Sequence, residues 1–348
     1  MSATIGIVGT AKNTGKTTTL SVLLKECTNH NEAIGLTGIG YDGEAVDNLT
    51  FLPKPRLDVP VGTWVATSSM CFEAATAKFD QITSIGLSTS LGDLQVARVM
   101  KEGRIILAGP NSREGLDKVI TILKEKGCEK IMVDGSLGRI IPLTAAKGIV
   151  FATGAARNTD PEVLAEEMSS ISEIFNWQDD LPEKSFPQNI TIKYKDGKSN
   201  EIGINSILTN DDIKTIDSLI SDSGKIIIPG VIAESMWKPF LSLIKNKEMS
   251  LLFYHPGVIM LHGSIPDLVE NLNEFRKNGG RISFQHQLSI KAITLNPFYP
   301  KKLSGLYKEA FIDKTELRKA FEQSLNLPLF DVKQDSPIDL FKSCFKIS

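Results

Sequence analysis

The sequence predicts an α/β fold, with a first domain built on a mostly parallel sheet and a second, smaller α/β domain after it. Short apolar segments rich in β-branched residues alternate with stretches of helical period along most of the chain. A short loop joins the first apolar segment to the tripeptide Gly-Lys-Thr at residues 15–17. A chain of 348 residues is long for a single hydrophobic core, which favours two domains.

The opening of the chain has the order strand, loop, helix. Residues 4–10 suit a buried strand, and the apolar residues that begin at Leu20 suit a helix. The residues that we expect to bind phosphate here are Gly9, Thr10, Asn13, Thr14, Gly15, Lys16, Thr17 and Thr18. Converging backbone N–H groups and a helix N-terminus solvate a polyanion, so this order predicts a phosphate-binding loop and hence a P-loop NTPase domain.

Individual residues of the loop carry more specific expectations. Lys16 is expected to reach the β- and γ-phosphates, and Thr17 to hold Mg²⁺ through its hydroxyl. Lys12 is interpreted as a solvated loop residue. In the usual pattern G-x-x-x-x-G-K-S/T the first glycine falls at Thr10, and Gly9 lies one residue earlier. Either Thr10 takes the turn from strand to loop, or the loop is one residue longer.

Two later strands are predicted to end at the same edge of the sheet. Residues 33–40 suit a buried strand, and acidic residues follow it at residues 42–47. Residues 130–134 form a short apolar strand that ends in Asp134, as a Walker B element requires. Ligands of open α/β sheets bind beyond the carboxyl ends of the strands, so Asp134 is predicted to bind Mg²⁺ there together with Thr17.

The remaining elements place the domain boundary. In the first domain, which covers residues 1–176, further strands are predicted at residues 62–67, 84–98, 103–108 and 148–155, and helices at residues 70–79, at 113–126 and from Pro161 onward. Residues 177–189 are predicted as a linker. In the second domain, which covers residues 190–348, helices are predicted at residues 211–220, 235–245 and 266–277, and strands at 225–230, 250–254, 258–261, 281–284 and 290–295. Residues 296–300 suit a rigid turn that either lines a cleft or closes a layer, and the second interpretation is favoured.

Composition narrows the class of protein. A net charge of −2 with interspersed signs gives no basic footprint for nucleic acid. No apolar run approaches the length of a membrane span, which predicts a cytoplasmic protein. The four cysteines are widely spaced, which predicts neither a disulfide framework nor a zinc site. The Asn-Lys-x-Asp motif that reads guanine is missing, so ATP is the expected nucleotide, bound with Mg²⁺.

Three stretches together resemble one family. They are residues 5–18, residues 38–44 with 52–56, and residues 133–136. The chain looks like the nucleotide-binding subunit of lysine 5,6-aminomutase reactivase. The similarity covers the first half well, and the strand that ends at residues 294–297 extends it weakly into the second half.

The resemblance implies a chaperone-like ATPase. Such a protein would work with a second reactivase subunit on a cobalamin-dependent aminomutase, and would use ATP to let a damaged cobalamin exchange for a fresh one. Binding of the γ-phosphate would order a switch segment and hydrolysis would release it. Asp42 and Glu44 are the candidate switch and catalytic carboxylates, one of which would position the attacking water while Lys16 stabilises the transferring phosphoryl group. A solvated turn explains the two acidic residues about equally well.

Two other classes of protein remain open. A ligase or kinase that resembles dethiobiotin synthetase would use the same loop to activate a small carboxylate or amine, which would face the glycine-rich residues 134–138. A nucleotide-sensing module would bind ATP with little turnover and leave the work to a partner. The sequence leaves the oligomeric state open.

Overall fold

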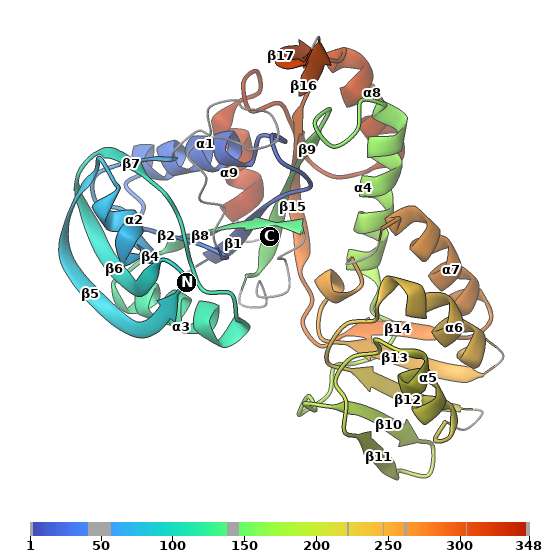
Figure 1. Ribbon diagram of the computed structural model, residues 1–348. Helices are drawn as coiled ribbons and strands as arrows, with labels where there is room; N and C mark the ends of the chain where they lie inside the picture. Colours follow the sequence, from blue (N-terminus) through green and yellow to red (C-terminus); the bar gives the residue numbers. More distant parts are fainter. Residues whose placement is uncertain are drawn as a thin grey trace. The chain divides into compact units, whose positions relative to one another are not determined.

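The computed structural model describes residues 3–40, 57–137, 146–220, 223–245, 247–260, 263–303 and 305–345 (Figure 1). The chain divides into two compact units. Unit 1 comprises Met1–Ala165 and Ser289–Ser348, and unit 2 comprises Glu166–Leu288, so the division falls within helix α4 (Pro161–Asn176). This differs from the predicted boundaries, because the last sixty residues belong to unit 1 and unit 2 is an insertion. The physical reason is that the strand after unit 2 pairs in the sheet of unit 1.

Unit 1 is built on a nine-stranded sheet, counted over the described residues. In spatial order its strands are β18 (Leu329–Phe330), β15 (Ser289–Asn296), β9 (Gly148–Gly154), β1 (Ala3–Gly9), β8 (Lys130–Ser136), β2 (Ile34–Gly38), β4 (Trp64–Ser68), β6 (Gly92–Lys101) and β5 (Lys78–Thr89). The strands from β18 to β4 pair in parallel, and β6 and β5 add an antiparallel edge. The sheet is therefore mixed but mostly parallel. Strands β3 (Leu57–Val59) and β7 (Gly103–Ile105) form a separate antiparallel pair.

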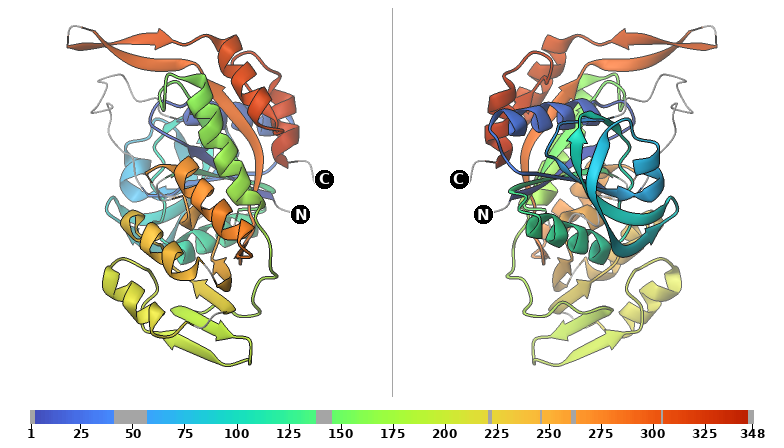
Figure 2. Two further views of the ribbon diagram at one scale, coloured as in Figure 1. Left: turned by 90° about the vertical axis from the view of Figure 1, so that its right-hand side faces the viewer. Right: turned by 90° about the vertical axis from the view of Figure 1, so that its left-hand side faces the viewer.

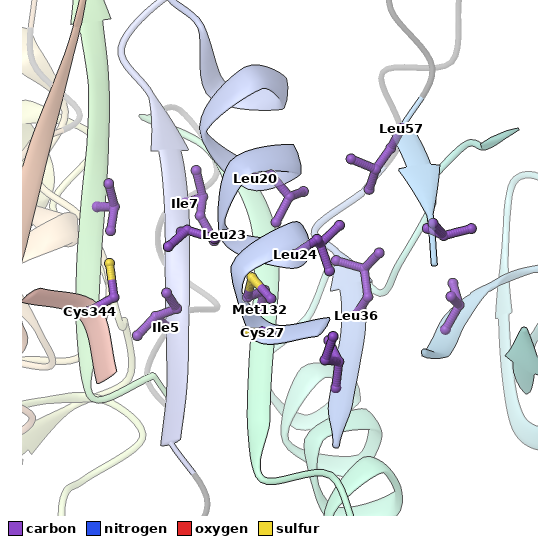
Figure 3. Close-up of a cluster of buried hydrophobic side chains, with 14 of the residues drawn as sticks. Ile5, Ile7, Leu20, Leu23, Leu24, Cys27, Leu36, Leu57, Met132 and Cys344 are labelled. Atoms are coloured by element: carbon purple, nitrogen blue, oxygen red, sulfur yellow. The ribbon is translucent and has the colours of Figure 1, made fainter. Parts of the chain in front are cut away.

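Helices cover both faces of this sheet. Helix α1 (Lys16–Asn29) packs on one face, where Figure 3 shows Leu20 and Leu24 among side chains of β1 and β2. Helix α3 (Arg113–Glu125) packs on the other face, because Leu123 lies against the side of Gly35 while Leu36 belongs to the α1 cluster. Successive residues of a strand point to opposite faces, so the two helices sandwich β2. The central strands are mostly apolar on both faces for this reason.

The C-terminal part of unit 1 completes its core. Helix α9 (Pro337–Phe345) packs beside α1 and contributes Leu340, Cys344 and Phe345 to the same apolar cluster. Helix α8 (Lys314–Ser324) precedes it. Between β15 and α8, the strands β16 (Phe298–Leu303) and β17 (Leu306–Phe311) form an antiparallel ribbon that reaches away from the rest of unit 1 (Figure 2).

Unit 2 has its own sheet and its own helices. The sheet order is β11 (Ser199–Ile202), β10 (Ile190–Tyr194), β12 (Ser223–Ile228), β13 (Glu248–Phe253) and β14 (Arg281–Phe284), with β12, β13 and β14 in parallel. The helices are α5 (Asn210–Asp217), α6 (Glu234–Ile244) and α7 (Ile265–Lys277), with a 3₁₀ turn η3 at Pro256–Val258. The predicted linker, residues 177–189, makes a backbone contact with strand β14 of this sheet, since Asp179 N–H donates to Ile282 O at 3.1 Å.

Three predicted elements are wrong. The first is the rigid turn at residues 296–300, where β15 and β16 are separated by Pro297 alone. Helix α2 covers only Ser69–Glu73, and the chain is already in strand β5 at Lys78, where the prediction had extended the helix to residue 79. Residues 258–260 do not form the predicted strand, because Pro256 starts the turn η3 and the Nδ1 atom of His255 caps it by accepting from Gly257 N–H at 2.9 Å. Among the described residues, none of the helices has the length and apolar composition needed to cross a membrane.

Candidate functional site

The carboxyl ends of the central parallel strands form the edge that holds the predicted site. Gly9, the last residue of β1, is paired with Ser136 of β8 on one side and with Ala152 of β9 on the other. The chain that leaves β1 passes through α1 to β2, which lies on the β8 side of β1. The chain that leaves the adjacent strand β9 next joins this sheet as β15, which lies on the other side of β9 from β1. Connections that leave adjacent strands in opposite directions open a crevice at their carboxyl ends, and ligands of open α/β sheets bind there.

The loop between β1 and α1 turns through two left-handed residues. Asn13 has φ 66° and Gly15 has φ 95°. Asparagine and glycine are the residue types that adopt this conformation at least cost. Helix α1 begins at Lys16 with Gly15 as its N-cap, and no side chain caps it and no acidic residue lies in its first turn. The first N–H groups of α1 therefore have no side-chain acceptor from the cap, and the positive end of the helix dipole points out of the loop.

The conformations of Gly9 and Thr10 explain why glycine stands one residue earlier here than in the usual loop pattern. Thr10 is not among the residues with positive φ, so this position needs no glycine. Its N–H donates to Ala152 O at 3.0 Å, and its hydroxyl donates to the hydroxyl of Thr153 at 2.9 Å. A Cβ atom on Gly9 would lie 3.2 Å from Thr14 Oγ1 and 3.3 Å from Ala11 O, which is tighter than ordinary contact. Gly9 therefore lets the loop fold close over the strand, and Thr10 ties the loop to β9.

Lys16 and Asp134 form an ion pair across the edge. The Nζ atom of Lys16 lies 3.1 Å from Oδ1 of Asp134, and both side chains are mostly buried, with exposed fractions of 19% and 23%. The two residues come from different elements, the first turn of α1 and the strand β8 next to β1. A cation and a carboxylate thus share one partly desolvated edge beside an uncapped helix N-terminus. This arrangement brings together a group that binds phosphate and a group that binds a divalent cation.

The threonines of the loop and helix have different surroundings. Thr17 is half-buried in the first turn of α1 and Thr18 is exposed. The hydroxyl of Thr14 is turned inward and donates to Ala11 O at 2.9 Å, so this residue can offer a ligand its backbone but not its side chain in this conformation. Thr19 is buried and its hydroxyl lies 2.8 Å from that of Thr294 in β15. Lys12 is exposed, as predicted.

One residue at this edge was not predicted as part of the site. Asn296, the last residue of β15, lies beside Gly15, and its Nδ2 atom donates to Asn13 O at 2.8 Å. The only signal in the sequence is an asparagine between a β-branched strand and a proline, which equally suits a plain turn. Thr153 and Thr294 were also missed, because buried threonines in strands carry no local signal of a neighbour.

Some predicted residues lie outside the described part of the chain. Asp42 and Glu44 belong to residues 41–56, outside the described ranges. The strand that leads to them does reach the site edge, since Ile39 N–H donates to Asp134 O at 2.8 Å. Within the described ranges, no group of three or more His, Cys, Asp or Glu side chains is arranged to hold a metal ion.

A hollow of about 660 Å³ lies elsewhere in unit 1. Its lining includes Ile34 and Trp64, the first residues of β2 and β4, so it opens at the amino ends of the strands. Lys126 lies over the ring of Trp64, 4.9 Å from its centroid, and fills part of the space. Neither Lys16 nor Asp134 lines this hollow.

No model of a known protein family matches the chain, and the comparisons with curated proteins and with solved structures give no match. The interpretation of the site therefore rests on its own geometry and chemistry.

Proposed function

We propose that this chain is a P-loop ATPase that binds Mg-ATP at the edge between β1 and β8 and hydrolyses it to ADP and phosphate. One observation carries the proposal: an uncapped helix begins at a lysine whose ammonium group lies 3.1 Å from the aspartate of the neighbouring strand. Each feature alone is common. Together they supply backbone donors, a cation and a metal-binding carboxylate within one small region.

Each residue has a distinct role in this proposal. The backbone of Gly9 to Gly15 and the first turn of α1 bind the phosphate oxygens, and Lys16 neutralises charge on the β- and γ-phosphates. The hydroxyl of Thr17 and the carboxylate of Asp134 are oxygen ligands of the kind that Mg²⁺ prefers. A bound Mg²⁺ ion would lower the charge repulsion between the phosphate and the nucleophile. Lys16 would leave Asp134 when the phosphates arrive. The carboxylates of Asp42 and Glu44 remain the candidates for positioning water.

The cellular role that we propose is that of a reactivating factor for a cobalamin-dependent aminomutase. The support is the resemblance of residues 5–18, 38–44 with 52–56, and 133–136 to the nucleotide-binding subunit of a reactivase. The protein would then act with a second subunit, and ATP turnover would drive the exchange of a damaged cobalamin. The test uses purified lysine 5,6-aminomutase inactivated by turnover. ATP-dependent recovery of the mutase activity with this chain and the second subunit supports the role. A lack of recovery with both ATP and GTP refutes it.

The ATPase proposal is tested by calorimetry and phosphate release. Mg-ATP should bind the unaltered protein, and Lys16→Ala should lose this binding without loss of fold. Lys12→Ala is the matched control, because Lys12 is an exposed lysine of the same loop and should leave binding unchanged. A lack of heat with both Mg-ATP and Mg-GTP would refute the proposal.

Product analysis separates ATP hydrolysis from the two alternatives. Phosphate release without an added acceptor supports a hydrolase. Strict dependence on a small carboxylate or amine instead indicates a ligase or kinase of the dethiobiotin synthetase type. Tight binding with turnover near the background rate, even with partners present, indicates a nucleotide-sensing module.

A further inference from the structure

The amide side chain of Asn296 bridges the end of β15 and the phosphate loop. Its Nδ2 atom donates to Asn13 O at 2.8 Å, and its Oδ1 atom accepts from Phe298 N–H at 3.2 Å. The two residues of the first contact are 283 positions apart, on either side of the inserted unit 2. The contact is partly buried, so water competes for it less than at an exposed site.

The backbone of Asn296 is held as firmly as its side chain. Ala155 N–H, just beyond β9, donates to Asn296 O at 2.9 Å. Gly154 has φ 152°, and a side chain at this position would overlap Asn296 O, so glycine is required for the two strand ends to meet. Hydrogen bonds therefore hold both the backbone and the side chain of Asn296 in place.

A fixed carbonyl at Asn13 has a direct effect on the next amide. The oxygen of Asn13 and the N–H of Thr14 belong to one planar trans peptide and point in opposite directions. When Asn296 binds the oxygen, the Thr14 N–H is directed away from Asn296. The left-handed conformation of Asn13, with φ 66°, is stabilised by the same bond. Sequences of right- and left-handed residues turn successive N–H groups into one concave anion site.

We propose that Asn296 is a positioning residue that holds the empty phosphate loop in its binding conformation. This inference rests on the proposed function, since a preorganised loop lowers the entropy lost when phosphate binds. Asn296 need not touch the nucleotide for this role. The inserted unit 2 thus separates, in sequence, a binding loop from the side chain that shapes it.

The experiment compares Asn296→Ala with Thr294→Val. Thr294→Val removes the 2.8 Å hydroxyl contact of β15 with Thr19, so it also loosens the strand but leaves the bond from Asn296 to Asn13 O in place. Hydrogen exchange of the amides at residues 13–16 is measured without nucleotide, and Mg-ATP affinity is measured by calorimetry. For Asn296→Ala we expect exchange about five- to tenfold faster and affinity weaker by a similar factor, as the loss of one hydrogen bond predicts. The kcat at saturating ATP should stay close to that of the unaltered protein, and Thr294→Val should accelerate the exchange of these amides clearly less than Asn296→Ala, because it reaches Gly15 only through the hydroxyl of Thr19.

Other outcomes separate the two proposals. Unchanged exchange in Asn296→Ala overturns the role of Asn296, and so does equal acceleration by Thr294→Val, which would indicate a general loosening of β15. If the unaltered protein binds no nucleotide, the proposed function fails, while the exchange experiment still decides whether Asn296 orders the loop. If Asn296→Ala does not fold, Asn296→Asp decides, because it keeps the side-chain volume and the acceptor for Phe298 but cannot donate to Asn13 O at neutral pH.

Discussion

The hydroxyl of Thr10 donates to the hydroxyl of Thr153 at 2.9 Å, and both residues are buried. Thr10 occupies the position at which phosphate loops usually have glycine. The loop of this protein therefore leaves its strand as an extension of the sheet, tied to β9 through both the backbone and the side chain of Thr10. The left-handed residues that let the loop turn come later, at Asn13 and Gly15.

Replacing Thr10 by the usual glycine should destabilise the protein. Thr10→Gly loses a buried hydrogen bond and adds backbone freedom to the unfolded chain, which together cost about 1–2 kcal/mol. Chemical denaturation of unit 1 measures the change. Thr10→Val, which keeps the shape and loses only the hydroxyl, should also be destabilised because it leaves Thr153 without this partner. Unaltered stability of both variants would contradict the proposed role of the hydroxyl pair.

Gly154 should tolerate no side chain. Gly154→Ala places a methyl group on the carbonyl of Asn296, so we expect a loss of more than about 3 kcal/mol or a failure to fold. Gly127→Ala is the control in the same unit, since Gly127 also has a left-handed φ, 85°, but has no atom within 4 Å of the added methyl. Its cost should be that of the backbone alone, about 1 kcal/mol. Equal unfolding midpoints for the two variants would show that the contact with Asn296 is not critical.

Asp134→Asn should separate catalysis from nucleotide binding. The variant keeps the shape of the side chain but loses the charge that pairs with Lys16 at 3.1 Å. We expect turnover to fall on the order of 100-fold and to lose its dependence on Mg²⁺, because a preorganised charge in the transition state is removed. The affinity for metal-free ATP should not fall, since Lys16 no longer has to leave a carboxylate. A titration of ATPase rate against Mg²⁺ checks this, and an unchanged Mg²⁺ requirement would exclude Asp134 as the metal ligand.

Asp179 should make the stability of unit 2 depend on pH. Burial alone would raise the pKa of Asp179, but hydrogen bonds from Arg276 at 2.8 and 3.0 Å and from Ile282 N–H at 2.9 Å outweigh it and lower the pKa below its ordinary value. A carboxyl with a lowered folded pKa contributes stability above the unfolded pKa of about 3.9 and loses it as the pH falls through the folded value. Asp179→Asn should therefore cost about 2 kcal/mol at pH 7, and the difference should shrink below about pH 4.

The control for this pH dependence is Asp211→Asn in the same unit. Asp211 also pairs with a basic side chain, that of Lys214 at 2.7 Å, but the side chain of Asp211 is 87% exposed. Exposed pairs of this kind contribute little to stability. Denaturation curves between pH 3 and 7 should thus separate the two variants, and parallel curves would contradict the prediction.

The cysteines should be unreactive in the native protein. Burial raises the pKa of the Cys27 thiol to about 12, and the nearby carboxylate of Glu32 adds to the effect. Burial also raises the pKa of Cys128 to about 12, and Cys71 and Cys344 are buried as well. Because the thiolate is the nucleophile, iodoacetamide at pH 8 should label none of the four within minutes and all of them in urea. Rapid labelling of any one in the native state would show that its surroundings open.

How far the sequence predicts this structure depends on how many residues separate two interacting groups along the chain. The order of strand, loop and helix follows from local chemistry, although the helical pattern begins at Leu20 in the sequence and α1 itself begins at Lys16. The approach of Lys16 to Asp134 follows from the rule that parallel strands end at one edge. The approach of Asn296 to Asn13 does not, because nothing local tells β15 to pair with β9 across an inserted unit. For the same reason the boundary of the second domain was misplaced.

The position of α9 has a consequence for the order in which the two units can fold during translation. Leu340 and Phe345 close the apolar cluster over α1, yet they follow the whole of unit 2 in the sequence and are translated after it. Unit 2, which is continuous in sequence, can reach its native state while the nascent chain still lacks β15 and α9. Unit 1 cannot complete its core until β15 and α9 have been translated, so part of the apolar cluster around α1 is without its native partners until then.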